Sequence, residues 1–292
     1  MAALEHRGDD VVRLGRGTPD GDAPRWDPDA GTISTAAFDG VDAVVHLAGE
    51  GIGEKKWTPE QKEKIRDSRV KGTTLLANTL AALPVKPRVL VSGSAVGYYG
   101  DRGDEVLDES SSSGGDFLAD ICRQWEAAAQ PAADAGIRLV TIRTGIVLHP
   151  RGGVLKSLLT PFKLGLGGRT GSGKQWMSWI ALDDEIGSIL HAIDRESLTG
   201  PVNLTAPGPV TNAELAKTLG RVLHRPAVLP TPLLPLKVIF GSELVTALLV
   251  GGQRVLPNKL SADGYRFQYV ELEAAFRALL APMPAGGNRP AS

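Results

Sequence analysis

Short apolar runs recur along the chain, and longer segments with helical spacing separate them. Runs that are brief, β-branched and nearly continuous are typical of strands buried on both faces of a sheet. We expect strands at residues 9–16, 41–49, 87–95 and 137–148. Because helical segments connect these runs, the pattern predicts an α/β fold, with a parallel sheet covered by helices on both faces.

The first long helical segment has a recognisable beginning. Residues 58–83 are predicted to form a helix with Thr58 as N-cap, Pro59 as the first helical residue and Gln61 closing a capping box. Its later apolar residues recur at helical spacing and predict a buried stripe.

The second half of the chain repeats the alternation and then changes. Residues 116–136 are expected to form a helix that ends at Gly136. A strand is predicted in "WMSWI" (176–180), followed by a helix over residues 182–197. After about residue 205 prolines interrupt the pattern, and a capped helix begins at "TNAEL" (211–215), which predicts a smaller C-terminal subdomain.

Composition adds limits. The 292 residues include 42% hydrophobic and 22% charged residues, which are ordinary globular values, and the formal net charge is −1. That charge argues against a general surface for nucleic acid or anionic membrane, and no apolar run is long enough to span a bilayer. The start has no signal-peptide pattern, so we expect a cytoplasmic protein. The single cysteine, Cys122, excludes an internal disulfide, and the scattered histidines predict no metal site.

A glycine-rich stretch raises one alternative. Residues 168–174 fit the first seven positions of the phosphate-loop pattern G-x-x-x-x-G-K-[ST], but Gln175 stands where the hydroxyl is needed. The upstream residues do not read as a buried strand, and the downstream residues predict a strand instead of a helix. We therefore interpret the stretch as a loop without a triphosphate-binding role.

Two motifs carry a family resemblance. "VVHLAGE" (44–50) and "VSGSAVGYYG" (91–100) resemble the extended short-chain dehydrogenase/reductase superfamily, in its NAD(P)-dependent epimerase/dehydratase branch. With "IRTGIVL" (142–148) and "PFKLGLGGRTGSGKQWMSWI" (161–180), the chain is most similar to an atypical sugar-nucleotide-epimerase-like subfamily that carries a small extra C-terminal domain. The resemblance extends from about residue 9 to about residue 280 and implies a Rossmann-like, doubly wound parallel sheet.

The resemblance implies a division of the chain. Residues 1–150 and 176–204 are expected to form the NAD(P)-binding domain, and residues 151–175 and 205–281 a substrate subdomain of α/β type. The tail, residues 282–292, is expected to be disordered.

The beginning of the chain departs from the family pattern. "AALEHRG" (2–8) is similar to the last turns of a helix that Gly8 terminates, yet no first strand and G-x-x-G-x-x-G loop precede it. We expect the sequence to begin about 15–20 residues late, most simply through a misplaced start codon. The alternative is a shortened protein that does not bind the cofactor.

The resemblance also implies which residues meet the cofactor. They lie at strand ends: Arg16, Leu47, Ala48, Gly49, Ser92 and Gly145. At the position of Arg16 an acidic residue would bind a ribose 2′-OH, whereas arginine pairs with a 2′-phosphate, so NADP(H) is favoured over NAD(H). The alternatives are a solvated cation for Arg16 and a simple strand-ending turn for the "LAG" of residues 47–49.

Ser94 aligns with the active-site hydroxyl of the family, and Tyr98 or Tyr99 beyond it is expected to face the pocket. The alternative for Ser94 is a cap at a strand end. The catalytic Tyr-x-x-x-Lys pair has no counterpart: the corresponding helix offers Phe117 and Ile121 or, shifted by one residue, Leu118 and Cys122. Cys122 is read as a small buried residue in preference to a reactive thiol.

A small-molecule substrate is expected to meet a set of polar and aromatic residues around the cleft: Arg69, Arg143, Lys163, Lys174, Gln175 and Trp176. For Arg143 an alternative role is to anchor the loop after its strand. His46 is predicted to be a satisfied core histidine, and the acids at 183–185 are expected to stabilise a helix N-terminus instead of forming a catalytic pair.

Two functions remain open. One is an NADP(H)-dependent oxidoreductase or epimerase for a nucleotide-sugar-like or other polar carbonyl or hydroxyl substrate. The other is a non-catalytic NADP(H)-binding module that signals to a partner. The retained Ser94 and substrate loop favour the first, and the missing Tyr-x-x-x-Lys pair favours the second. The sequence does not define the substrate or the oligomeric state.

Overall fold

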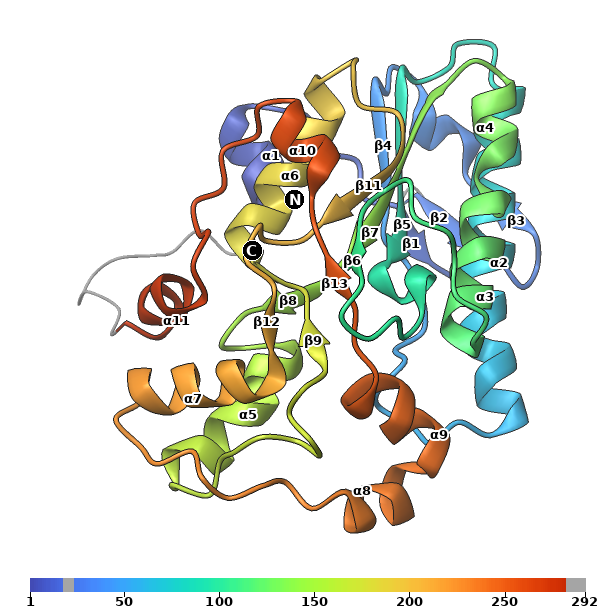
Figure 1. The fold of residues 1–292 in the computed structure, drawn as a ribbon. Coiled ribbons are helices and arrows are strands. Elements are labelled where there is room, and N and C mark those ends of the chain that lie inside the picture. The colour runs from blue at the N-terminus through green and yellow to red at the C-terminus, as the bar shows by residue number, and fades with distance from the viewer. Residues whose placement is uncertain (18–23, 282–292) are drawn as a thin grey trace.

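A parallel four-stranded sheet forms the centre of the molecule, for which a computed structural model describes residues 1–17 and 24–281 (Figure 1). Its strand order is β11-β7-β5-β4, from Gly200–Leu204, Arg138–Thr144, Val89–Ala95 and Ala43–His46. All three pairings are parallel. The predicted parallel sheet is confirmed. The predicted disordered tail, residues 282–292, lies outside the described residues.

Helices cover both faces of this sheet. On one face α2 (Pro59–Ala82), α3 (Phe117–Ala128) and α4 (Gln130–Asp134) pack side by side. On the other face lie α1 (Ala2–Arg7), α6 (Leu182–Asp194) and α10 (Asn258–Ala262). The strands are therefore buried on both sides, which explains their nearly continuous apolar sequence.

A second group of elements lies below the sheet in Figure 1. The helices α5 (Gly153–Lys163), α7 (Asn212–Val222) and α11 (Leu272–Leu280) share one apolar core with β8 (Ile146–Leu148) and β10 (Trp179–Ala181). Trp179 and Phe276 are fully buried at its centre. α7 begins with a complete capping box between Thr211 and Glu214, which confirms the predicted capped helix.

Short elements complete the fold. The remaining strands are β1 (Gly15–Arg16), β2 (Arg25–Asp27), β3 (Thr32–Ile33), β6 (Val106–Leu107), β9 (Trp176–Met177), β12 (Val210–Thr211) and β13 (Arg254–Val255). The remaining helices and helical turns are η1 (Thr35–Phe38), η2 (Val96–Tyr99), α8 (Leu233–Phe240), α9 (Ser242–Val245) and η3 (Thr246–Val250). Within residues 1–17 and 24–281, no helix combines the length and the apolar character needed to cross a membrane.

The strand predicted at residues 9–16 is mostly wrong. Only Gly15 and Arg16 form a strand, which pairs with Arg25 and Trp26 in a small sheet apart from the central one. A strand requires a ladder partner for its backbone groups. Among the described residues β4 is the edge of the central sheet, and residues 9–14 have no ladder partner there.

Three predicted elements are interrupted. The strand at 137–148 breaks at Gly145, where a side-chain Cβ would lie 2.4 Å from the Ser178 carbonyl oxygen. The strand at 176–180 breaks at Ser178, whose hydroxyl donates to the Gln253 carbonyl and accepts from the Val255 amide. The helix at 116–136 is split at Ala129, one residue before α4.

The helix predicted over residues 58–83 is confirmed, with one correction. Thr58 accepts from the Gln61 amide at 3.2 Å as its N-cap. The Gln61 side chain does not close a capping box, because its amide donates to Glu50 Oε1 at 3.2 Å instead. Gln61 therefore ties the helix to the loop that follows β4.

Candidate functional site

The carboxyl ends of β4, β5 and β7 lie at one edge of the sheet, because these strands are parallel neighbours. His46 is paired in register with Ser92, and Ser94 is paired with Arg143. Most of the predicted cofactor and catalytic residues therefore meet at one place. This edge is where ligands bind in open α/β sheets.

Ser94 is held by a glutamate that the sequence interpretation missed. Its Oγ donates to Glu126 Oε1 at 2.7 Å, from β5 to α3. Arg143 binds the same carboxylate through two nitrogens, Nε to Oε1 at 2.8 Å and Nη2 to Oε2 at 2.9 Å. Such a bidentate pair fixes both position and orientation of the carboxylate. The available signal was that Glu126 follows Leu118 and Cys122 at helical spacing, on the same face of α3.

Arg143 is committed to partners within the protein. Its side chain is 3% exposed, and its Nη1 donates to the Tyr99 hydroxyl at 3.1 Å. Its guanidinium carbon lies 3.4 Å from the centroid of the Tyr98 ring. Burial lowers the pKa of Arg143, but the hydrogen bonds and ion pair with Glu126 outweigh burial and leave this pKa raised. The contacts of Arg143 are thus with Glu126 and the two tyrosines and not with the loop after its strand, and its role in substrate binding stays a prediction.

The two tyrosines after Ser94 belong to this network. Tyr99 is fully buried and donates to Asn203 Oδ1 at 2.7 Å, and burial raises the pKa of Tyr99 to about 12. Tyr98 stacks against Tyr99 edge to face and carries Arg143 over its ring. Neither tyrosine lies beside the cavity described below.

The contacts of α3 favour one of the two registers considered for the missing catalytic pair. Cys122 Sγ contacts the Ala95 carbonyl at 3.8 Å, and a Cβ on Gly97 would lie 3.4 Å from Leu118 Cβ. Leu118 and Cys122 are therefore the residues of α3 that face the end of β5. Cys122 is 5% exposed, and burial raises the pKa of its thiol to about 11. The reading of Cys122 as a small buried residue is confirmed.

The loop after β4 has features that fit a dinucleotide. Leu47 is 55% exposed at this edge. Beneath the loop, Arg69 Nη1 donates to the carbonyls of Glu50 and Ile65 at 2.9 and 3.0 Å. A Cβ on Gly49 would lie 3.0 Å from the Arg69 guanidinium carbon, so a larger residue there would have to displace that side chain.

Arg69 and Ser92 supply the polar groups for such a ligand. Burial lowers the pKa of Arg69, and among the described residues no carboxylate is within ion-pair distance of it. The Ser92 hydroxyl is fully buried and has no hydrogen-bond partner among the residues described. A cation without a counter-ion and a hydroxyl without a partner are groups that a phosphate, ribose or amide would satisfy. Arg69 thus lies beside the loop that follows β4, and its role in binding stays a prediction.

A second glutamate lies on the opposite face of β7. Glu185 Oε1 accepts from Thr144 Oγ1 at 2.9 Å, and Glu185 Oε2 is buried without a partner in the described part of the chain. Burial raises the pKa of Glu185 to about 7. Its neighbour Asp184 accepts from the Gln268 and Tyr269 amides at 2.8 and 3.0 Å. Asp184 therefore holds the C-terminal segment against α6, whereas Glu185 Oε2 has no such bond among the described residues.

Other predicted residues have partners outside the group around Ser94. Arg16 ends β1 with 61% of its side chain exposed, 3.8 Å from the exposed Asp29. Trp176 donates to Asp104 Oδ1 at 2.8 Å, and Gln175 donates to the Leu249 carbonyl at 2.7 Å. Lys163 and Lys174 are exposed. The structure does not gather Lys163, Lys174, Gln175 and Trp176 around Ser94, and their role in substrate binding stays a prediction.

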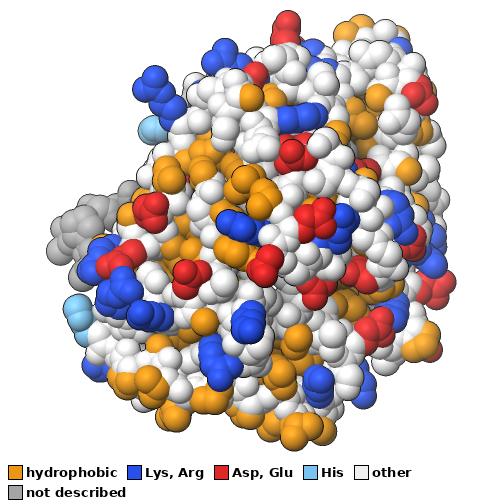
Figure 2. Space-filling model, in the orientation of Figure 1, with side chains coloured by type: hydrophobic (Ala, Val, Ile, Leu, Met, Phe, Trp, Pro, Cys, Tyr) orange, Lys and Arg blue, Asp and Glu red, His pale blue; other side chains and the backbone are white. Residues whose placement is uncertain are grey.

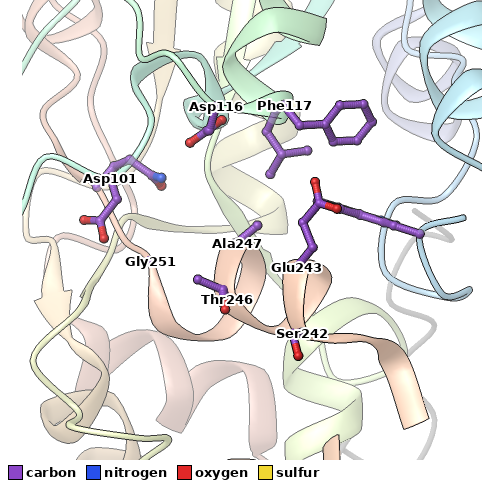
Figure 3. A pocket seen from close by; sticks show the side chains of 12 residues that line it. Asp101, Asp116, Phe117, Ser242, Glu243, Thr246, Ala247 and Gly251 are labelled. Atoms are coloured by element: carbon purple, nitrogen blue, oxygen red, sulfur yellow. The ribbon is translucent and has the colours of Figure 1, made fainter. Parts of the chain in front are cut away.

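A cavity of about 380 Å³ lies between the start of α3 and the C-terminal helices (Figure 3). Asp116, Phe117 and Leu118 line it from α3, and Gly97 lines it from η2, directly beyond the strand that carries Ser94. Figure 3 shows Ser242, Glu243, Thr246 and Ala247 on the opposite wall, with Glu243 directed toward Phe117. None of the six predicted substrate residues lines this cavity.

Two further sequence interpretations, of His46 and of the glycine-rich stretch, are confirmed. His46 is 5% exposed, its Nε2 lies 3.0 Å from Thr73 Oγ1, and burial lowers the pKa of His46 to about 4. It is a satisfied core histidine. The glycine-rich stretch at 168–174 follows helix α5 and precedes strand β9, so it lacks the strand–loop–helix context of a phosphate loop.

Comparison with known proteins agrees with this geometry. The model of the NAD dependent epimerase/dehydratase family matches residues 2–204, and a domain of unknown function, DUF1731, matches residues 231–279. Epimerase family protein Mb2239 of Mycobacterium bovis is 42% identical over 269 residues, which are 92% of this chain and 88% of that protein.

Solved structures show the same likeness. Human epimerase family protein SDR39U1 (isoform2), solved with NADPH, superposes with a TM-score of 0.84 at 33% identity, over 95% of this chain and 92% of that one. The Thermus thermophilus UDP-glucose 4-epimerase complex with NAD superposes with a TM-score of 0.69 at 19% identity, over 94% and 91% of the two chains, and shows the fold alone.

The sheet, its helical layers and the polar groups at its carboxyl edge define a Rossmann-like α/β protein of the NAD(P)-binding type. The predicted fold class is confirmed by these neighbours. The chain belongs to the NAD dependent epimerase/dehydratase family, and its relatives include the SDR39U1 proteins.

Proposed function

We propose that the protein is an NADP(H)-dependent oxidoreductase or epimerase for a small polar carbonyl or hydroxyl substrate, in which Ser94 and Glu126 replace the Tyr-x-x-x-Lys pair. One observation carries this proposal. The Ser94 hydroxyl donates to Glu126 Oε1 at 2.7 Å, at the strand end that leads to the cavity. A donor and acceptor aligned in this way form a path for a proton.

A bound nicotinamide supplies the hydride acceptor or donor, and the residues of the chain move the accompanying proton. Because Ser94 donates its own proton to Glu126, its lone pairs are free to accept one from a substrate hydroxyl. During alcohol oxidation the substrate O–H bond breaks, its proton passes to Ser94 Oγ, and the Ser94 proton passes to Glu126 Oε1. Reduction runs in reverse. Arg143, supported on the Tyr98 ring, is a positioning residue for Glu126.

For the cofactor we propose NADP(H), with Arg16 binding the 2′-phosphate and with Leu47–Gly49, Arg69, Ser92 and Gly145 along the remainder of the dinucleotide. Within residues 1–17 and 24–281 the exposed Arg16 side chain has one surface ion pair, at 3.8 Å, and such a weak pair would let it turn toward a phosphate. The human relative solved with NADPH supports this preference.

The cavity supports a limit on the substrate. Asp101 and Asp116 line it without an ion-pair partner among the described residues, and Glu243 is paired with Lys62. Carboxylates repel a diphosphate. We therefore propose that the part of the substrate within the cavity is neutral or positively charged, such as a polyol or an amino sugar. Turnover restricted to nucleotide diphosphate sugars in a substrate screen would contradict this.

A second function is favoured by a different observation. Leu118 and Cys122 occupy the positions of the usual catalytic pair, and neither side chain transfers protons at neutral pH. A non-catalytic NADP(H)-binding module would need only the cofactor edge and no proton path. The two functions differ in what Ser94 must do.

The test combines binding and turnover. The binding of NADPH and NADH is followed by nicotinamide fluorescence. We expect Arg16→Ala to weaken the binding of NADPH about tenfold and the binding of NADH very little. Hydride exchange is then followed with a panel of alcohols and carbonyls. Ser94→Ala should lower turnover by about 10²–10³-fold with unchanged NADPH affinity. The exposed serine variant Ser157→Ala is the control and should match wild type.

Each outcome separates the candidates. Cofactor binding with exchange that depends on Ser94 supports the enzyme. Binding without exchange, or exchange indifferent to Ser94→Ala and Glu126→Gln, favours the module. If neither nucleotide binds, the assignments of Arg16 and Arg69 are wrong.

A further inference from the structure

Two segments of the chain hold all their charge in one sign. Residues 151–175 contain five Lys or Arg residues and residues 215–242 contain four, and neither segment contains Asp or Glu. The net charge of −1 for the whole chain averages over this segregation. Basic charge is therefore concentrated on one part of the protein.

The same segments hold most of the exposed aliphatic surface. Of the fourteen large hydrophobic side chains that are exposed in the described residues, eight belong to these two segments. They include Leu164 and Leu166 at 68% and 59% exposure, and Val228 at 78%. Single exposed hydrophobics are normal, but a concentration of them marks an interaction surface.

The two segments lie side by side. The Leu229 amide donates to the Gly167 carbonyl at 3.3 Å, and Thr231 donates to Arg169 at 2.8 Å. Along the lower edge of the molecule, where Figure 1 places α5, α7 and α8, Figure 2 shows hydrophobic side chains beside Lys and Arg. We call this surface, formed by residues 163–174 and 225–240, the basic aliphatic edge.

Helix α8 is the most exposed part of the basic aliphatic edge. Leu233, Leu236 and Phe240 pack against the core beneath it. On its other side Leu234, Val238 and Ile239 are 78%, 79% and 63% exposed. Apart from Lys237 every residue of α8 is apolar; such a helix is normally covered on every side, and here half of it faces solvent. The exposed half therefore requires a partner.

We propose that the basic aliphatic edge docks on the surface of an anionic lipid bilayer. The aliphatic side chains would enter the boundary between headgroups and acyl chains while Lys163, Arg169, Arg225 and Lys237 meet the lipid phosphates. Of the nine cations only Arg221 forms an ion pair with an acidic side chain among the residues described, so the others are available.

The charge of the basic aliphatic edge argues against a second copy of the chain as its partner. If a second copy docked through the same surface, two-fold symmetry would bring the cations of one edge against those of the other. The contact surface also lacks the Trp and Tyr anchors that dominate protein–protein interfaces. Exposed aliphatic side chains surrounded by lysine and arginine fit an anionic lipid surface better than they fit a second copy of the chain.

The experiment measures sedimentation of the full chain with two kinds of vesicle, phosphatidylcholine alone and an equimolar mixture of phosphatidylcholine and phosphatidylglycerol. We expect sedimentation with the anionic vesicles only, weakened by high salt. Leu234→Asp with Val238→Asp should weaken it more than about tenfold, and Lys163→Glu with Lys237→Glu by about fivefold for each cation lost.

Matched controls come from another surface. Val85 is 79% exposed, as is Val238, and Lys86 beside it is exposed. The variant Val85→Asp with Lys86→Glu should bind vesicles as wild type does. All variants alter solvent-facing side chains, and urea unfolding checks that they are folded.

Several results would overturn the proposal. They are no sedimentation with anionic vesicles, equal sedimentation with both kinds, or variants that bind as wild type does. A dimer that Leu234→Asp with Val238→Asp dissociates, seen by analytical ultracentrifugation, would assign the surface to a second copy. If a DNA or RNA oligonucleotide binds at the basic aliphatic edge and displaces the protein from the vesicles, the surface would be assigned to nucleic acid.

Discussion

Two glutamates lie on opposite faces of the same strand, and their surroundings differ: Glu126 is partly buried and Glu185 is buried. Arg143 and Thr144 are consecutive in β7, so their side chains point to opposite faces of the sheet. Arg143 meets Glu126 on the α3 side, and Thr144 meets Glu185 on the α6 side. Glu126 has the guanidinium and the Ser94 hydroxyl as partners, whereas Glu185 has one hydroxyl.

This difference shows how hydrogen-bond partners distinguish two carboxyl groups at one edge of the sheet. A carboxylate with a bidentate arginine keeps its charge in a buried setting. A single neutral donor offsets little of the free energy that a carboxylate loses when it leaves water. Burial therefore raises the pKa of Glu185 to about 7. We infer that the carboxylate on the α3 side is balanced by its arginine, whereas the α6 side holds a group that titrates near neutrality.

The largest expected effect comes from breaking the fixed pair. Arg143→Met should lower the free energy of unfolding by about 3 kcal/mol, because it leaves the partly buried carboxylate of Glu126 without its counter-ion. Urea unfolding measures the loss. The double variant Arg143→Met with Glu126→Gln should recover much of it, since no unpaired charge remains.

Arg66→Met is the control for removing an arginine ion pair at the surface. Arg66 pairs with Glu63 and Asp67 while 42% exposed, and its loss should cost less than about 1 kcal/mol. Equal costs for Arg66→Met and Arg143→Met would show that the buried pair contributes no more than a surface pair.

The next effect tests the titrating side. The pKa of Glu185 is about 7 in the folded protein against an ordinary value of 4.5, so folding takes up a proton between these pH values. The free energy of unfolding therefore falls as the pH rises through this window, by about 3 kcal/mol in all. Glu185→Gln cannot ionise and should be more stable than wild type by up to about 3 kcal/mol at about pH 8, and nearly equal to it at about pH 5.

Asp184→Asn supplies the contrast from the adjacent residue. Burial raises the pKa of Asp184 as well, but its oxygens accept from two backbone amides. An asparagine turns one acceptor into a donor, so this variant should lose about 1–3 kcal/mol at both pH values. If Glu185→Gln changes stability equally at both pH values, Glu185 does not titrate in this window.

The sequence predicted the architecture well, because strands covered on both faces leave continuous apolar runs and capped helices leave signals at their ends. Thr58 and Thr211 cap their helices as expected. The interruptions at Gly145 and Ser178 could not be predicted, because they depend on how closely β7, β8 and the segment around Val255 approach one another. The strand predicted at residues 9–16 depended on pairing partners in the same way. An apolar pattern alone does not show whether a neighbouring strand is present to pair with.

The site was predicted in part. Ser94 and Leu47–Gly49 stand at the expected edge because parallel strands end together, and the motif places them at strand ends. Glu126 and Glu185 were not predicted as functional, since a glutamate on an amphipathic helix is indistinguishable from a solvated one until its partners are known. Arg143 was assigned to substrate for the same reason, although its donors bind Glu126 and Tyr99.

The smallest effect compares the two hydroxyl donors directly. Ser94→Ala removes one bond from Glu126 but leaves both bonds from Arg143, so it should cost about 1 kcal/mol. Thr144→Val removes the hydroxyl on which the ionised form of Glu185 depends, which should raise the pKa of Glu185 further. Its cost should therefore grow from small at about pH 5 to about 1 kcal/mol or more at about pH 8. Urea unfolding of both variants at the two pH values measures the difference. A cost for Thr144→Val that does not change with pH would mean that Glu185 carries the same charge throughout, and the two faces of β7 would then not differ in the way their hydrogen bonds indicate.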